Sequence, residues 1–392
     1  MNVLVLNAGS SSVKYDLYDL PAGAGGAVPA GAVPAGTRVV GGTIDRLDGA
    51  DAVDAAIHRV FDELGERTRR LAAVGHRVVH GGAKLVRPVV IDDAVLAAID
   101  ACSAFAPLHN PLNLRGIRAA RARFPALPHV AVFDTAFHAT IPAHAVLYGL
   151  PYELYLEHGF RRFGFHGPSH QYMAVRAAAH LGGDATRLRL ITCHLGGGAS
   201  VAAIAGGASI DTSMGLTPLE GLVMATRPGD LDPAIPGLLL ARGYSPERLA
   251  DLLNHHAGLA GLSGLGADVR DIEAAADRGH ARARLALEVF VHRIRKYLGG
   301  YAVELGGVDA LVFAGGIGEG SAQIRARVCA GLALLGLALD PDRNAGVRLE
   351  ATGGLAEISV PGAAARILVV HTEEERMIAR DVVACLAGGE PS

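Results

Sequence analysis

The sequence predicts an α/β protein made of two related domains, and three observations support this fold class. Short apolar runs alternate along the chain with segments of helical periodicity, which is the pattern of an α/β architecture. An apolar hairpin at Val3–Tyr18 recurs at Leu188–Ala203, almost half the chain later, which indicates a duplication. Glycine accounts for 51 of 392 residues and aromatic residues for only 5%. This composition favours thin, closely packed α/β layers over an aromatic-anchored β-sandwich.

The elements follow from these patterns in chain order. Strands are predicted at the apolar runs, which are Val3–Asn7, Val13–Tyr18, His129–Phe133, Leu188–Cys193, Ala310–Phe313 and Ile367–Val370. Helices are predicted where apolar residues recur every three to four positions, at Asp51–Ala72, Asp92–Ala104, Pro111–Ala122, Ser169–Leu181, Pro246–His255, Ala267–Leu298, Ser321–Leu334 and Glu373–Leu386. Pro21–Gly36 is a low-complexity stretch in which AVPAG occurs twice, and we expect a surface loop without chemistry.

Bulk properties exclude several classes of protein. The formal net charge is −3, and without a basic surplus a dedicated nucleic-acid binder is disfavoured. The four cysteines (Cys102, Cys193, Cys329 and Cys385) form no C-x-x-C pair, so we expect free thiols in a reducing cytosol. No signal peptide and no apolar run long enough for a membrane span is present, and a cytoplasmic protein is therefore expected.

The residues that follow the apolar runs are the first candidates for a site, because ligands of α/β proteins bind beyond the carboxyl ends of the strands. These residues are polar or glycine: Asn7, Asp134, His194, Gly315 and Glu374. Amide and carboxylate oxygens are suitable ligands for Mg²⁺. The glycine-rich turns at 196–198 and 315–320 would let backbone N–H groups approach phosphate oxygens.

Two arginines and a histidine complete a pattern suited to phosphoryl transfer. Arg77 and Arg227 each lie among glycines, and guanidinium groups bind carboxylate or phosphate with two hydrogen bonds. His166 directly precedes a predicted helix. Walker A, GxGxxG and GxSxG motifs are absent from the sequence. Phosphoryl transfer needs positioning, metal and cations rather than a protein nucleophile, so these absences do not count against it.

Ten segments in order along nearly the whole chain resemble the acetate kinase family: NAGSSSVKY, GHRVVHGG, APLHNP, FDTAFH, RFGFHGPSH, HLGGGAS, DTSMGLTPLEG, TRPGDLDP, FAGGIGE and HTEEERMIARD. The resemblance implies two duplicated ribonuclease H-like domains of the actin-like ATPase type that face a central cleft. It places an acyl-substrate-side domain at residues 1–150, completed by the C-terminal helix at 373–392, and a nucleotide-binding domain at 151–372. The implied activity is reversible, Mg²⁺-dependent transfer of the ATP γ-phosphate to acetate.

The resemblance also implies residue roles. Metal ligands (Mg²⁺, with Mn²⁺ as a substitute) would be Asn7 and Glu374. Catalytic residues would be Arg77, Asp134, His166, His194 and Arg227, with His109 supporting the site. Arg77 would also bind acetate, beside an apolar pocket for its methyl group formed by Val79, Leu108, Phe165 and Pro218. ATP would contact Ser10, Ser12, Lys14, His194, Leu195, Gly196, Gly197, Gly198, Asp268, Val269, Arg270, Gly316, Ile317, Gly318, Glu319 and Gly320.

We expect direct in-line attack by a carboxylate oxygen, because a carboxylate needs no general base at neutral pH. A phosphoenzyme route through Glu374 is the alternative, and it would compete with the metal role of that residue. The resemblance further implies closure of the domains around the substrates, a homodimer, a cytoplasmic location and a place in acetyl-CoA biosynthesis. It implies no nucleic acid and no membrane as partner.

The sequence departs from the family pattern at four positions. Gly197 and Gly320 stand where asparagine is usual, and Pro168 and Pro228 replace small polar residues. The HLGGG form also resembles butyrate kinases, so a kinase that prefers propionate or butyrate is the nearest alternative. A non-catalytic nucleotide sensor on the same fold is a second alternative, which the retention of all charged site residues disfavours. A dinucleotide-dependent oxidoreductase is disfavoured by the missing GxGxxG.

Overall fold

The computed structural model describes residues 1–9, 12–21, 36–45, 52–182 and 184–388. Ser10 and nearly all of the low-complexity stretch Pro21–Gly36 lie outside the described residues. The chain divides into two compact units. Unit 1 comprises Met1–Ala139, Phe165–Val175 and Glu373–Ser392, and unit 2 comprises Thr140–Gly164 and Arg176–Thr372. None of the helices in the described ranges is long and apolar enough to span a bilayer.

Among the described residues each unit contains one six-stranded mixed sheet, and the two sheets share one topology. Their strand orders are β3-β2-β1-β4-β6-β5 and β9-β8-β7-β10-β12-β11. In each sheet three antiparallel strands precede two parallel ones, and an antiparallel edge strand completes the order. The repeated hairpin of the sequence corresponds to β1–β2 and β7–β8. The prediction of an α/β chain with two similar domains is therefore confirmed.

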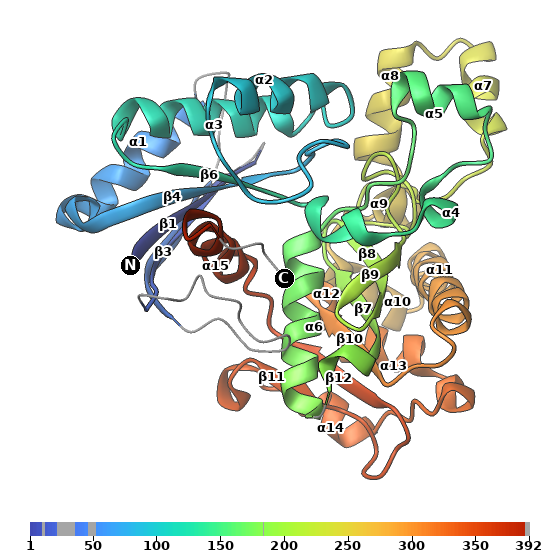
Figure 1. Cartoon of the computed structure of the whole chain (residues 1–392). Coiled ribbons are helices and arrows are strands. Elements are labelled where there is room, and N and C mark those ends of the chain that lie inside the picture. Colours follow the sequence, from blue (N-terminus) through green and yellow to red (C-terminus); the bar gives the residue numbers. More distant parts are fainter. Residues whose placement is uncertain (10–11, 22–35, 46–51, 183, 389–392) are drawn as a thin grey trace. The chain divides into compact units, whose positions relative to one another are not determined.

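The strands of unit 1 are β1 (Asn2–Ala8), β2 (Ser12–Asp19), β3 (Thr37–Asp45), β4 (Leu71–Val78), β5 (Val89–Val90) and β6 (His129–Phe133). Those of unit 2 are β7 (Arg189–Leu195), β8 (Ala199–Ala205), β9 (Ala208–Thr212), β10 (Ala310–Ala314), β11 (Leu355–Glu357) and β12 (Arg366–Val370). The α-helices are α1 (Ala52–Leu64), α2 (Asp93–Ala101), α3 (Asn110–Arg123), α4 (Ala143–Val146), α5 (Tyr152–His158), α6 (Gly167–Leu181), α7 (Ala234–Ala241), α8 (Pro246–Asp251), α9 (Gly258–Ser263), α10 (Val269–Asp277), α11 (Ala281–Glu304), α12 (Gly315–Gly320), α13 (Ala322–Cys329), α14 (Pro341–Ala345) and α15 (Glu374–Leu386). Figure 1 shows them along the chain.

Glycines with positive φ explain where the predicted helices were too long. Within the helix predicted at Asp51–Ala72, the α-helix ends at Leu64, where Gly65 has a φ of 50°. A 3-10 helix at Gly65–Arg70 follows, and Leu71 begins strand β4. The single helix predicted at Ala267–Leu298 is two helices, α10 and α11, separated at Gly279 with a φ of 92°. Strand β4 was not predicted, because both of its faces are buried and its sequence does not alternate between apolar and polar residues. The glycine segment 315–320, expected as a turn, forms the short helix α12.

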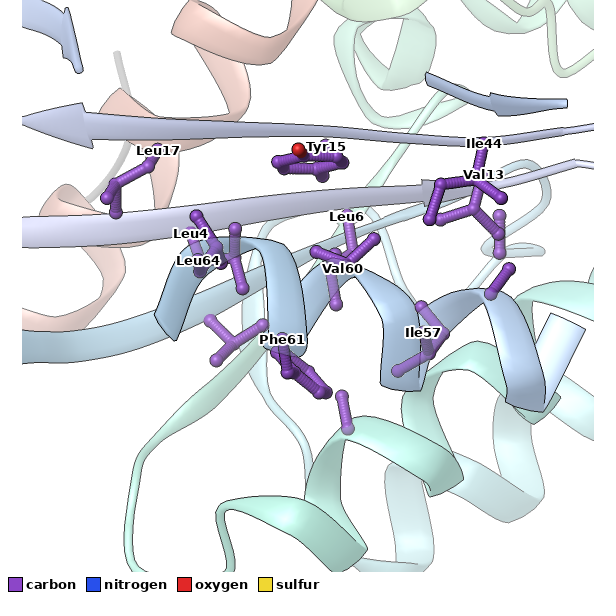
Figure 2. Packing of buried hydrophobic residues seen from close by; sticks show 14 of the residues in the cluster. Leu4, Leu6, Val13, Tyr15, Leu17, Ile44, Ile57, Val60, Phe61 and Leu64 are labelled. Carbon is purple, nitrogen blue, oxygen red and sulfur yellow. The ribbon is translucent and has the colours of Figure 1, made fainter. Parts of the chain in front are cut away.

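The core of unit 1 is built on both faces of its sheet. Figure 2 shows one face, where Leu4, Leu6 and Val13 pack against Ile57 and Phe61 of α1. On the opposite face the side chains that alternate with these pack against α15, the C-terminal helix, and this second cluster includes Val3, Val5, Ala73, Val130, Val132, Ile378 and Val382. Because side chains alternate strictly along a strand, these clusters determine on which face of the sheet each later residue of the strand lies.

Candidate active site

Strand alternation places the polar residues of unit 1 on the face that α15 covers. Val3 and Val5 of β1 belong to the α15-facing cluster, so Asn7 presents to the same face. The same count in β4, where Gly75 approaches Ile378 and Val382, places Arg77 there. In β6 Val130 and Val132 lead in the same way to Asp134, directly after the strand. The parallel strands β1, β4 and β6 thus bring three polar residues together at the carboxyl ends of the strands, near the N-terminus of α15.

Arg77 and Asp134 form a bidentate ion pair at this edge. Nε and Nη2 of Arg77 donate to Oδ1 and Oδ2 of Asp134, both at 2.8 Å. Glu374, the first residue of α15, lies 3.8 Å from Arg77 Nη1. Asp134 is 2% exposed and Arg77 19% exposed. Two carboxylates therefore surround one nearly buried guanidinium, and the structure brings these three sequence candidates together.

The electrostatics of this cluster keep Arg77 charged. Burial disfavours the guanidinium cation, but attraction to Asp134 and Glu374 outweighs that effect and raises the pKa of Arg77 above its ordinary value. Asp134 is held from its backbone as well, because its N–H donates to Val78 O at 3.0 Å and its carbonyl accepts from Gly167 N–H at 2.9 Å. Arg77 is consequently a fixed positive charge rather than a proton donor.

Strand β2 adds a further cation beside Asn7. Lys14 is the ladder partner of Asn7 in the antiparallel β1–β2 pair, so the two side chains share a face. The Lys14 side chain is exposed, and Ser12 begins the same strand at the same edge of the sheet. Ser12, Lys14 and Asn7 are therefore neighbours of the Arg77 cluster (Arg77, Asp134 and Glu374) within one sheet.

His166 occupies a strained backbone position next to Asp134. Its φ is 59°, and no other non-glycine residue in the described ranges has a positive φ. The residues on both sides are tied down, since Phe165 O accepts from His138 Nε2 at 3.0 Å and Gly167 N–H donates to Asp134 O. Strained residues persist only where the surroundings hold them, and they cluster at functional sites. The geometry thus supports a functional position for His166.

Gly167 is required for this close approach, and its replacement provides a test. An added Cβ would lie 2.3 Å from Asp134 O. We expect Gly167→Ala to lower the free energy of unfolding by about 1–3 kcal/mol, as overpacking does. Displacement of Asp134 and His166 should also lower kcat by about 10²-fold. Chemical denaturation and steady-state kinetics measure both effects.

Gly300→Ala is the matched control, because Gly300 lies inside α11 and an added Cβ would meet no described atom within 4 Å beyond the adjacent backbone of its own helix. That change should be neutral or stabilising. Equal losses in both variants would refute the role given to Gly167.

Two buried asparagines of α3 hold the strand ends, although no sequence pattern predicted them. Asn113 accepts from Val79 N–H at 3.1 Å and donates to Ala8 O at 2.8 Å. Asn110 accepts from His80 N–H and donates to His80 O. The available signal was an i, i+3 pair of asparagines at a helix start. His109, the expected supporting residue, is the N-cap position of this helix.

The four residues expected around an acetate methyl group differ in exposure and in unit. Leu108 is 43% exposed, whereas Phe165 is 1% exposed and its ring packs edge-on against His80. Val79 is half-buried and follows β4 directly, next to Arg77. These three belong to unit 1, and Pro218 belongs to unit 2.

In unit 2 the two glycine segments lie side by side at the ends of neighbouring strands. His194 of β7 pairs with Ala314 of β10. Gly315 follows with a φ of 77°, and an added Cβ there would lie 2.7 Å from Leu195 O. An added Cβ at Gly196 would lie 3.8 Å from both His194 Nε2 and the backbone nitrogen of Gly316. The structure thus brings His194, Leu195, Gly196, Gly197 and Gly198 next to Gly316, Ile317, Gly318, Glu319 and Gly320.

The two glycines that depart from the family pattern are not required by the backbone. At Gly197 and at Gly320 an added Cβ would meet no described atom within 4 Å beyond the adjacent backbone, and neither residue has a positive φ. A side chain could therefore stand at either position without strain. Pro168 occupies the first turn of α6, where a missing N–H is tolerated.

Arg227 is a half-buried guanidinium that no carboxylate pairs with among the described residues. Its Nη1 donates to Pro218 O at 2.7 Å. Within the described part of the chain no acidic side chain pairs with it, and burial alone lowers its pKa to about 10. Such a group remains charged at neutral pH, and binding of an anion beside it is favourable. Pro218 and Arg227 are therefore joined, and the pair is suited to bind carboxylate or phosphate.

Asp268, Val269 and Arg270 lie at the start of α10, and Glu273 of the same helix accepts from the hydroxyl of Ser321, the residue after Gly320. Asp268 is the N-cap and accepts from Arg270 N–H at 2.9 Å, and its carboxylate also pairs with the Arg270 side chain at 2.6 Å. The side-chain and backbone hydrogen bonds from Arg270 lower the pKa of Asp268 to about 2. Asp268 and Arg270 are exposed, whereas Val269 is buried, and the hydrogen bonds of the Asp268 carboxylate are to its own helix start.

The donor set of unit 1 fits a Mg²⁺ ion. In the described ranges no three His, Cys, Asp or Glu side chains are grouped to hold a metal by themselves. Mg²⁺ usually keeps several waters and binds through one or two protein oxygens together with substrate phosphates. The Asn7 amide and the Glu374 carboxylate, at the edge beside Asp134, supply oxygens of this kind. The residues present therefore fit a metal shared with a phosphate ligand.

Comparison with known proteins agrees with these features. The sequence profile of the acetokinase family matches residues 2–380. An acetate kinase from Treponema denticola is 45% identical over 412 aligned residues, which cover 98% of this chain and 99% of that protein. Crystal structures of Porphyromonas gingivalis acetate kinase (TM-score 0.87, 39% identity, 98% and 99% coverage) and a Francisella tularensis propionate kinase (0.84, 38%, 97% and 98%) match as well. The chain belongs to the acetokinase family.

Proposed function

We propose that this protein is an acetate kinase, which transfers the γ-phosphate of ATP reversibly to acetate and forms acetyl phosphate and ADP. The observation that carries the proposal is Arg227, a half-buried cation with one carbonyl partner and no carboxylate in the described residues. A bound anion supplies the missing counter-charge. Asp134 already neutralises the charge of Arg77, so Arg227 is better able than Arg77 to neutralise a bound anion.

The chemistry needs two anions brought together, and the chain supplies the cations. An acetate oxygen attacks the γ-phosphorus in line and needs no general base at neutral pH. Arg227 binds the carboxylate or the phosphoryl group in transit, and Asp134 orients Arg77. His166 and His194 donate to phosphoryl oxygens. When bound by Asn7 and Glu374, Mg²⁺ or Mn²⁺ would neutralise charge on the phosphate oxygens.

The remaining assignments extend this proposal to both halves of the chain. Residues 1–150, completed by 373–392, form the acyl-substrate side and residues 151–372 the nucleotide side. Val79, Leu108, Phe165 and Pro218 limit the acyl group. ATP contacts the two glycine segments, residues 268–270 and the β1–β2 hairpin with Ser10, Ser12 and Lys14. We further propose a cytoplasmic homodimer with acetate and ATP as its substrates.

A chain-length series tests the acyl assignment. With ATP and Mg²⁺, kcat/KM should be highest for acetate and should fall for propionate and butyrate. Each methylene that a small apolar pocket rejects is worth about 1–3 kcal/mol, or roughly 10–200-fold in kcat/KM. Omission of Mg²⁺ is the control for each substrate. A higher kcat/KM for butyrate than for acetate would sink the acetate assignment.

A propionate kinase is the second candidate. Its support is the 38% identity and the TM-score of 0.84 with the Francisella tularensis propionate kinase. The same series distinguishes the two, because a propionate kinase should give its maximum at three carbons. Equal values for acetate and propionate would favour a mixed specificity.

A further inference from the structure

The carboxylate of Glu319 binds two separate segments of unit 2. Its Oε1 accepts from Gly315 N–H at 3.0 Å, from Thr372 N–H at 3.1 Å and from the Thr372 hydroxyl at 3.0 Å. Its Oε2 lies 2.7 Å from His371 Nδ1. The side chain is 17% exposed. Both carboxylate oxygens thus have partners within the protein. Oε1 joins the start of α12 to Thr372, after β12, and Oε2 contacts only His371 in that same segment.

A second charged residue, Arg325, also holds helix α12 in place by hydrogen bonds. Arg325 is 1% exposed, and its Nη1 donates to Gly318 O at 2.9 Å and to Glu319 O at 2.8 Å. Asn344 in turn accepts from Arg325 Nε at 2.7 Å. At the other end Gly315 lies against Leu195 O, with no space for a Cβ. The glycine segment therefore cannot move without breaking buried hydrogen bonds.

The segment that Glu319 holds leads directly to the proposed metal ligand. His371 N–H donates to Gly354 O at 2.8 Å within unit 2. Thr372 is the last residue of unit 2, and Glu373 begins the C-terminal part of unit 1. Glu373 accepts from the Tyr172 hydroxyl at 2.6 Å, and Glu374 lies beside Arg77. The residue that Glu319 contacts, Thr372, is thus directly followed in the chain by a residue fixed in unit 1.

We propose that Glu319 is a positioning residue that couples the glycine segment 315–320 to the crossover segment 371–376. The inference rests on the proposed function, because it takes the glycine segment to be part of the nucleotide site. Glu319 acts through Gly315 and Thr372 rather than through its carboxylate on the nucleotide, since both oxygens already have protein partners. Nucleotide binding at residues 315–320 is thereby transmitted to Thr372 and onward to Glu374.

Hydrogen–deuterium exchange of the full chain, with and without ADP, tests this coupling. In the wild type ADP should slow exchange in peptides covering 315–320 and in peptides covering 371–376. In Glu319→Ala, ADP should still protect 315–320, while the ADP-dependent slowing in 371–376 should disappear. A coupling of ordinary size corresponds to a change of about 5-fold or more. A purely structural role would raise exchange with and without ADP equally and would leave the difference intact.

Companion variants keep the test decisive if Glu319→Ala folds poorly. Thr372→Val removes only the hydroxyl bond and should reduce the ADP-dependent slowing in 371–376. Glu319→Gln retains an oxygen acceptor and should restore most of it. Glu357→Ala is the matched control, because Glu357 is a carboxylate of the same unit whose partners, His180, Ser359 and Arg366, belong neither to α12 nor to residues 371–376. That variant should behave as the wild type.

The outcomes separate this inference from the proposed function. Full ADP-dependent protection of 371–376 in both Glu319→Ala and Thr372→Val would overturn the coupling and leave the nucleotide site intact. Absence of any ADP protection at 315–320 in the wild type would instead refute the nucleotide assignment and the coupling with it.

Discussion

Replacing Arg227 with glutamine should lower the rate of acetyl phosphate formation by about 10³-fold or more, as expected for an arginine that stabilises a transferring phosphoryl group. Glutamine can still donate to Pro218 O, so the loop should keep its geometry. The loss should appear in kcat and not only in KM, because the charge acts on the transition state. Turnover within tenfold of the wild type would refute the role of Arg227.

The same substitution should raise the thermal stability. Burial lowers the pKa of Arg227 to about 10, so above that pH the unfolded chain binds more protons at this residue than the folded chain. The charged form therefore costs stability below about pH 10, on the order of 3 kcal/mol, and the cost is relieved as the pH rises through that value. A neutral side chain avoids this cost. Thermal unfolding at pH 7 should show a higher Tm for Arg227→Gln than for the wild type.

Inorganic phosphate provides an independent check of the same charge. It should raise the Tm of the wild type, because a bound anion supplies the counter-charge that Arg227 lacks. The effect should be smaller in Arg227→Gln. A lower Tm in the variant at pH 7 would contradict the electrostatic account, even if activity is lost.

Replacing Asp134 with asparagine should have the second largest effect, with the opposite consequence for stability. Removal of one member of a buried bidentate pair leaves the Arg77 charge with Glu374, which is 3.8 Å away. We expect a loss of about 3 kcal/mol in the free energy of unfolding. The rate should fall by about 10²–10³-fold, because Arg77 is no longer fixed where charge develops.

Asp309→Asn is the matched control for this experiment. Asp309 forms a similar bidentate pair with Arg189, at 2.7 and 3.2 Å, but both side chains are partly exposed. Such pairs contribute about 1 kcal/mol or less, and Arg189 lies at the start of β7, away from its glycine end. Chemical denaturation and kinetics should therefore show little change. Comparable losses in the two variants would indicate that general stability, rather than the position of Arg77, determines the rate.

Much of the fold was predictable because its signals are local. The apolar runs of β6, β10 and β12 and the period of α15 are read directly from the sequence, and the repeated hairpin revealed the duplication. Strand β4 was not predictable from alternation, because both of its faces are buried. The helix ends at Gly65 and Gly279 depend on positive φ values, which glycine permits but does not require.

The candidate residues were likewise predictable by type but not by partner. Polar residues after strands, glycine segments and two arginines can be recognised in one dimension. The use of Glu319 by Thr372 and the strain of His166 could not be recognised in this way. The role of Asn113, which joins Ala8 to Val79, has no local sequence signal other than the position of the residue at a helix start.

The sequence by itself determined the α/β class, the duplication, the family resemblance and the set of charged residues at the strand ends. Only the tertiary structure decided which arginine is neutralised and which keeps an uncompensated charge. Arg77 and Asp134 are 57 residues apart and meet because β4 and β6 are parallel neighbours in fixed register. Arg227 is half-buried and donates to a carbonyl instead. Local sequence sets period and turn chemistry, whereas the partner of a buried charge depends on strand order and register, which arise only when the sheet forms.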